Sequence, residues 1–260
     1  MDILNNNERM YQNPYEIDLD ENGFLALNEK NARFIGAAYR LDSKYRKSFD
    51  VNDSNSAFYY IIQNANRIDG NYEVIKEICT RLDRENSTHL SVWGDHNENN
   101  NGIEITAKVI SKIENLNEEL KNGSTQLVEI IASAVQKRYN FSFATKFCTF
   151  MCRFLFSGTP EAHNYCIYDN VLARVIPYYA WNFIGRKYIN RRGGSSIESM
   201  FKNKHNYSGY EELIDTIRMK ASKKYNYMTT REEFDAMLWY YYKGNNDVIN
   251  SAYEKICAEN

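Results

Sequence analysis

Proline is scarce in this chain, with only Pro14, Pro160 and Pro177 among 260 residues. Because proline interrupts helices and favours turns, its scarcity is typical of a protein built from long helices. The sequence also shows no convincing alternation of apolar and polar residues, which half-buried strands would require. The sequence therefore predicts an all-α protein.

Metal-binding residue patterns are also missing. The chain has four histidines in loop-like segments without ligand spacing, and none of its five cysteines forms a CxxC pair. Zinc and iron–sulfur sites need such clusters of ligands. The odd number of cysteines, most of them in apolar segments, is typical of reduced thiols in a protein core. We expect no metal and no organic cofactor.

No apolar segment approaches the roughly 20 uncharged residues that a membrane-spanning helix needs. The first residues, MDILNNNERMYQ, show neither the pattern of a secretory signal nor that of an organelle-targeting peptide. We therefore expect a cytoplasmic protein without a membrane partner. We expect residues 1–27 to form a polar arm or capping segment, and residues 28–260 to form the helical domain.

Helical periodicity and capping patterns place the expected helices along the chain. Apolar residues recur at intervals of three and four, and capping boxes are expected at Ser195 with Glu198, Ser208 with Glu211, and Thr230 with Glu233. The predicted helices span 28–41, 54–68, 71–85, 103–121, 125–138, 145–157, 169–186, 209–224, 230–243 and 246–258.

The distribution of charge is uneven although the formal net charge is only −2. Residues 137–224 contain 15 Lys and Arg against 6 Asp and Glu, and the rest of the chain contains 17 against 28. A basic segment within an acidic protein is the pattern expected if one surface meets a polyanion. Local bias on solvated helices explains it equally well.

Lys146 and Asp169 are the candidate catalytic residues. Each is expected at the start of an apolar helix, in the segments Ala144-Thr145-Lys146 and Ile167-Tyr168-Asp169. A partly desolvated lysine at a helix start is biased towards the neutral, nucleophilic amine, and a carboxylate there can stabilise a developing cation. The alternative is structural, because aspartate is a common N-cap and lysines are common at helix starts.

These two segments resemble the helix-hairpin-helix DNA glycosylase superfamily, in particular its 8-oxoguanine DNA glycosylase branch. In that family a hairpin delivers a nucleophilic lysine, and a later apolar-Asp motif delivers a catalytic aspartate. Two departures are visible: the hairpin Asn140–Ala144 has no glycine, and Ile-Tyr-Asp replaces Pro-Val-Asp.

The resemblance implies a two-lobed helical fold with a central cleft, and a catalytic segment at about 137–186. It implies a DNA N-glycosylase, with AP lyase activity if Lys146 attacks and without it if water attacks. The base expected from the resemblance is an oxidised purine such as 8-oxoguanine, in repair, or a modified phage base such as glucosylated hydroxymethylcytosine, in phage defence. The expected partner is duplex DNA with a modified base, and no obligate protein partner is evident. The residues expected to contact the DNA or the base are Lys137, Arg138, Ser142, Phe143, Thr145, Tyr168, Asn170, Arg174, Arg191 and Arg192.

A basic stretch from Arg186 to Arg192 precedes Gly193-Gly194-Ser195 and a predicted helix. Free amides at that helix start, together with the cations, would suit a phosphate, while a solvated loop is an equal alternative. For the whole protein, the alternative to an enzyme is a helical module that binds DNA or protein without chemistry.

Overall fold

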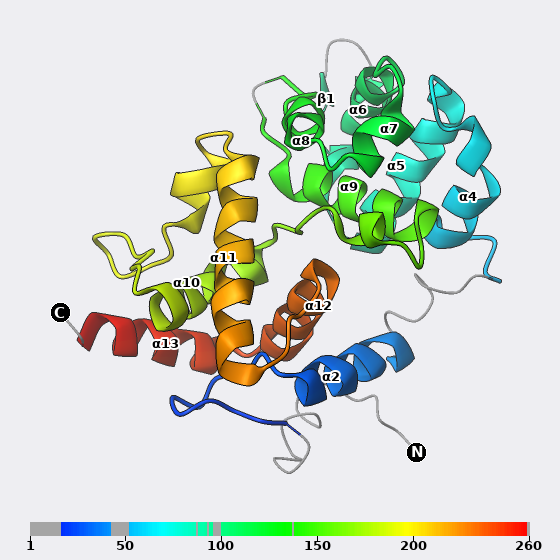
Figure 1. Ribbon diagram of the computed structural model, residues 1–260. Coiled ribbons are helices and arrows are strands. Elements are labelled where there is room, and N and C mark those ends of the chain that lie inside the picture. The colour runs from blue at the N-terminus through cyan, green and yellow to red at the C-terminus, as the bar shows by residue number, and fades with distance from the viewer. Residues whose placement is uncertain are drawn as a thin grey trace. The chain divides into compact units, whose positions relative to one another are not determined.

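The computed structural model describes residues 17–42, 52–86, 88–92, 94–95, 100–136 and 138–258 (Figure 1). Within this part of the chain nearly all regular structure is helical. The only named strands there are β1 (Gly94–Asp95) and β2 (Asn100–Asn101), an antiparallel pair of two residues each. The predicted all-α fold is confirmed.

The chain divides into two compact units. Unit 1 contains the described residues of Met1–Arg46, Asp169–Lys204 and Ser208–Asn260, and unit 2 contains those of Lys47–Tyr168 and His205–Tyr207. The boundary in the middle of the chain therefore falls between Tyr168 and Asp169.

Unit 2 is built around one long buried helix. Its helices are α4 (Ala57–Gln63), α5 (Tyr72–Asn86), α6 (Gly102–Ile110), α7 (Leu116–Lys121), α8 (Thr125–Ala132) and α9 (Phe141–Leu155), with short 3₁₀ turns at Ala65–Arg67, Leu90–Val92 and Pro160–His163. Eleven of the 15 residues of α9 are buried, and α9 packs against α4, α5, α7 and α8. A helix that is apolar on nearly every side belongs in the centre of a core.

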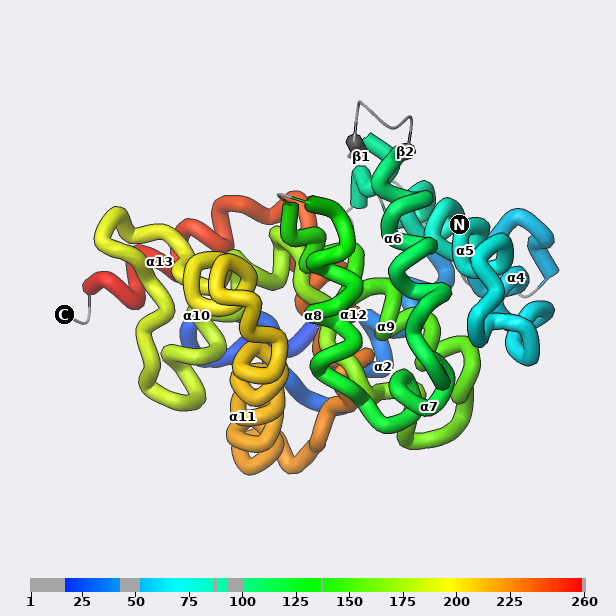
Figure 2. The backbone as a smooth tube through the Cα atoms, turned by 90° about the horizontal axis from the view of Figure 1, so that it is seen from above, coloured from blue at the N-terminus to red at the C-terminus, as the bar shows by residue number. Residues whose placement is uncertain are grey.

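Unit 1 contains α2 (Glu29–Leu41), α10 (Asn170–Ile184), a π-helical turn at Glu198–Lys202, α11 (Tyr207–Tyr225, all but its first residue), α12 (Arg231–Tyr242) and α13 (Asn246–Ala258). Helix α2 lies beside α12, and α10 packs against α12 and α13 (Figure 2). Residues 17–27 fall in the segment predicted as a polar arm. Within it, Phe24 and Leu25 are buried, and the Tyr179 hydroxyl donates to the Leu25 carbonyl at 2.9 Å.

Several predicted helix boundaries were wrong. The helix expected at 103–121 is two helices, because Asn115 adopts left-handed backbone angles (φ 54°, ψ 44°) between them. The helix expected at 125–138 ends at Ala132, and the one expected at 145–157 begins at Phe141. The segment 54–68 forms a shorter α-helix and a 3₁₀ turn. The remaining six predictions agree with the structure to within two residues.

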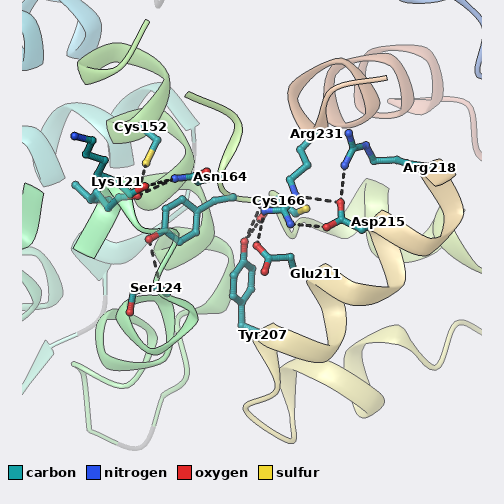
Figure 3. Close-up of polar contacts among 12 residues, drawn as sticks. Lys121, Ser124, Cys152, Asn164, Cys166, Tyr207, Glu211, Asp215, Arg218 and Arg231 are labelled. Atoms are coloured by element: carbon teal, nitrogen blue, oxygen red, sulfur yellow. Dashed lines mark hydrogen bonds and ion pairs between the residues drawn. The ribbon is translucent and has the colours of Figure 1, made fainter. Parts of the chain in front are cut away.

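Of the three predicted capping boxes, only the one at Thr230 and Glu233 is confirmed, with both of its hydrogen bonds present. Ser208 instead lies inside α11, which begins at Tyr207. The carboxylate of Glu211 pairs with Arg231, which also binds Asp215 (Figure 3). These ion pairs join the first half of α11 to the start of α12.

Ser195 does not cap a helix with Glu198. Its hydroxyl donates to the Ala173 carbonyl, inside α10. Pro177 explains this contact, because proline has no N–H with which to bond the carbonyl four residues earlier. A side chain from a later loop therefore supplies the hydrogen bond that the helix backbone lacks.

Candidate functional site

Lys146 is the sixth residue of α9, so the prediction that it lies in the first turn of a helix was wrong. It lies between the buried Thr145 and Phe147, and its own side chain is partly buried. Its Nζ donates to the carbonyl of Asn86, at a distance of 3.4 Å. Asn86 is the last residue of α5, where the helix dipole is negative, so this contact favours the charged ammonium. The expected bias towards the neutral amine does not come from the α9 terminus.

Thr145 connects α9 to the segment that leads to Asp169. The Thr145 side chain is fully buried, and its Oγ1 accepts a hydrogen bond from the Tyr168 N–H at 3.0 Å. The same hydroxyl lies 3.2 Å from the carbonyl of Ser142, to which it donates. The residues immediately before Lys146 and Asp169 are therefore hydrogen bonded to each other.

A second contact secures this segment within unit 2. The Tyr207 hydroxyl accepts from the Cys166 N–H at 2.8 Å (Figure 3). The Tyr207 N–H in turn donates to Glu129 Oε1 at 2.7 Å. Residues 166–168 are thus held through both Cys166 and Tyr168 before the chain enters unit 1.

Asp169 lies at the start of α10, as predicted, and is the N-cap of this helix. Its Oδ1 accepts from the Leu172 N–H at 2.8 Å, and the residue is only 7% exposed. Backbone N–H donors and the positive end of the helix dipole both favour the ionised carboxylate. The residue therefore has a structural role in capping α10.

The aromatic residues expected beside the base are buried. Phe143 and Tyr168 are each 2% exposed, and the Tyr168 ring packs on Phe141 with ring centres 4.8 Å apart. Either ring would have to move to contact a nucleotide. Ser142 is partly exposed, and Asn170, the first residue of α10, is exposed.

The basic residues expected to contact DNA lie in several separate segments of the chain. Lys137 lies outside the described residues. Arg138 is exposed and its Nε donates to Asn140 Oδ1 at 2.9 Å. Arg174 is exposed on α10, where it donates to Asn246 Oδ1 at 2.8 Å. Arg191 and Arg192 are exposed in unit 1.

The prediction of free amides after the basic stretch was wrong. The N–H groups of Arg192 and Gly194 donate to Asn190 Oδ1, at 2.9 and 3.1 Å, and the Gly193 N–H donates to the Asn190 carbonyl at 2.9 Å. The Ser196 N–H donates to the Tyr188 carbonyl. These amides hold the loop together and are not available to a phosphate.

Two contacts in and near the candidate segments had no signal in the sequence. Asn86 is 60 positions from Lys146, and Tyr207 is 41 positions from Cys166. Neither belongs to a motif or a periodic pattern. Only packing of α5 on α9 brings the Asn86 carbonyl to the lysine.

Among the described residues, no group of three or more His, Cys, Asp or Glu side chains is arranged to hold a metal ion. None of the helices in the described ranges is long and apolar enough to cross a lipid bilayer. A surface depression at the start of α5, lined by Arg67 and residues 69–73, contains none of the candidate residues.

Much of unit 2 is similar to a known protein family. Residues 38–153 match the HI_0787_N family model, which is described as an N-terminal domain. The matched segment is less than half of the chain. It includes Lys146 and ends before Asp169. No curated protein and no solved structure matches the chain.

Proposed function

We propose that this protein is a DNA glycosylase that excises a modified base from duplex DNA. The observation that carries the proposal is the hydrogen bond between Thr145 Oγ1 and the Tyr168 N–H. It joins the two short segments on which the resemblance to helix-hairpin-helix glycosylases rests. The two bonded residues lie 23 positions apart in sequence, and each directly precedes the residue to which a catalytic role is assigned.

In the lysine route, the Lys146 amine attacks the anomeric carbon of the extruded nucleotide. The N-glycosidic bond breaks, its electron pair leaves with the base, and the amine loses a proton. Opening of the sugar ring gives a Schiff base, from which elimination of the 3′ phosphate nicks the strand. The hydrogen bond to the Asn86 carbonyl favours the ammonium, so the lysine must first give up both this bond and a proton. At 3.4 Å this bond is long for a hydrogen bond.

Asp169 supplies negative charge in the transition state. Cleavage of an N-glycosidic bond builds positive charge on the sugar, and a fixed carboxylate stabilises this charge more than it stabilises the ground state. The N-cap contact with the Leu172 N–H orients the carboxylate. In a water route, the same carboxylate aligns the attacking water, and the product is an abasic site without a nick.

Two substrates fit the proposal. One is an oxidised purine such as 8-oxoguanine, which would make the protein a cytoplasmic repair enzyme. The other is a modified phage base such as glucosylated hydroxymethylcytosine, which would make it a defence enzyme. Residues 140–144 lack the family's hairpin glycines, and from Phe141 on they belong to α9. This departure from the repair enzymes makes a substrate outside repair as suitable as an oxidised purine. No cofactor is required for either reaction.

A helical DNA-binding or protein-interaction module is the second candidate function. Burial of Phe143 and Tyr168 and the contact of Lys146 with a backbone carbonyl all suit purely structural roles. Such a module binds without forming any covalent intermediate.

Borohydride trapping with abasic-site DNA separates the lysine route of the glycosylase from a binding module. A lysine Schiff base is reduced to a stable protein–DNA adduct, so the wild-type protein should give an adduct and Lys146→Gln should give none. Lys108→Gln is the matched control, because Lys108 is an exposed lysine on α6 of the same unit. Absence of an adduct with the wild-type protein would overturn the lysine route. An adduct formed by Lys146→Gln in the same yield as by the wild-type protein would show that another amine forms the Schiff base.

A further inference from the structure

Residues 186–196 form a basic hairpin in unit 1. They contain Arg186, Lys187, Arg191 and Arg192, all exposed, and no Asp or Glu. An isolated bridge pairs Ile189 with Ser195 across the hairpin. In the described part of the chain, the guanidinium groups of Arg186, Arg191 and Arg192 form no ion pair. Their charge is therefore not neutralised by a neighbouring carboxylate there.

The tip of the basic hairpin is closed by hydrogen bonds to Asn190. Asn190 Oδ1 accepts the N–H groups of both Arg192 and Gly194, and the Asn190 N–H donates to the Gly194 carbonyl at 2.8 Å. Gly193 has φ +77°, which a side chain would oppose, and a Cβ at Gly194 would lie 3.3 Å from the Asn190 amide nitrogen. The two glycines thus permit a closed turn, and the backbone of Arg191 and Arg192 lies within it.

The basic hairpin is also anchored to α10, the helix that Asp169 caps. Ser195 Oγ donates to the Ala173 carbonyl, which Pro177 leaves without a helical partner. The next residue of α10 is the exposed Arg174, whose own carbonyl accepts from the Tyr253 hydroxyl at 2.7 Å. The anchor therefore lies four residues after Asp169 along α10, and Arg174 adds a further cation beside it.

We infer that the basic hairpin grips the phosphodiester backbone of duplex DNA through Arg191 and Arg192, with Arg174 as an additional contact. Arginine suits phosphate because its planar fork donates two parallel hydrogen bonds. The choice of DNA as the polyanion rests on the proposed function. An anionic membrane surface is less suitable, because membrane-binding segments also insert apolar side chains. No large hydrophobic side chain within residues 186–196 is among the exposed ones.

The test is the salt dependence of binding to a short labelled duplex, measured by fluorescence anisotropy. Removing one phosphate-binding cation lowers the steepness of log K against log salt by about 0.9. Arg191→Ala/Arg192→Ala should therefore reduce the slope by about 2 and lower the affinity about tenfold or more at low salt. Lys220→Ala/Lys223→Ala removes the same charge from exposed positions of α11 and should leave the slope unchanged.

Asn190→Ala provides a second variant that keeps every cation. It removes the acceptor that closes the turn, so affinity should fall although the net charge is the same. Wild-type slope and affinity in the double arginine variant would overturn the inference. The inference would also be overturned if Arg191→Ala/Arg192→Ala lost binding to anionic-lipid vesicles and kept its binding to DNA.

Base release is measured separately on the same proteins, which keeps the two proposals distinguishable. If the salt slope depends on Arg191 and Arg192 but the protein releases no base, the inference about the basic hairpin stands and the proposed glycosylase function is wrong. If the protein releases the base but its DNA binding does not depend on Arg191 and Arg192, the glycosylase function stands and the inference about the basic hairpin is wrong.

Discussion

At the scale of single residues, one hydroxyl connects the two candidate segments. Thr145 has no exposed surface, and its Oγ1 accepts a hydrogen bond from the buried N–H of Tyr168. The sequence predicted Thr145 as a DNA-contacting residue by resemblance. It could not predict this contact, because a threonine hydroxyl has many possible partners and only the packed core selects one.

Thr145→Val should therefore destabilise the protein by about 1–3 kcal/mol, since valine keeps the shape and removes an acceptor from a buried amide. Thr145→Ser keeps the hydroxyl and should cost clearly less. Denaturant unfolding followed by circular dichroism measures both. Equal stability of the valine variant and the wild type would show that the hydrogen bond contributes nothing.

At the scale of elements, the sequence predicted helices well where local signals were strong. Asp169 as the N-cap of α10 and the Thr230–Glu233 capping box follow from residue type and spacing. The start of α9 was misplaced by four residues, because Asn140 occupies the cap position without forming a side-chain cap bond. Lys146 consequently lies deeper in its helix, and its Nζ contacts the end of α5 rather than open solvent at a helix start.

The contact between Ser195 and α10 also arises at this scale, and a double-mutant cycle tests it. Ser195→Ala should cost about 1 kcal/mol, because it removes the hydrogen bond to the Ala173 carbonyl. In a Pro177→Ala background the residue at 177 regains an N–H that can bond this carbonyl, so the same substitution should cost much less. Unfolding free energies of the four proteins give the coupling. Additive effects would mean that proline is not the reason for the contact.

At the scale of the whole molecule, the formal charge of −2 conceals a basic segment, of which the basic hairpin is the part with the most exposed arginine. The sequence located this charge, but its prediction that backbone amides there are free for a phosphate was wrong, because two of these amides donate to Asn190. The all-α class followed from composition and periodicity. The division into two units, with a boundary between Tyr168 and Asp169, had no local signal.

The proposed glycosylase requires Asp169 to be catalytic as well as structural, and Asp169→Asn separates the two roles. Asparagine caps helices as well as aspartate does, so stability should be retained while the negative charge is removed.

The most direct measurement is the rate of base release from duplexes that contain 8-oxoguanine or glucosylated hydroxymethylcytosine. The wild-type protein should release one of these bases, and Asp169→Asn should be slower by on the order of 10³-fold with an unchanged unfolding midpoint. Lys146→Gln should abolish release in the lysine route and spare it in the water route. No release from either duplex by the wild-type protein, or full activity in both variants, would contradict the proposed function.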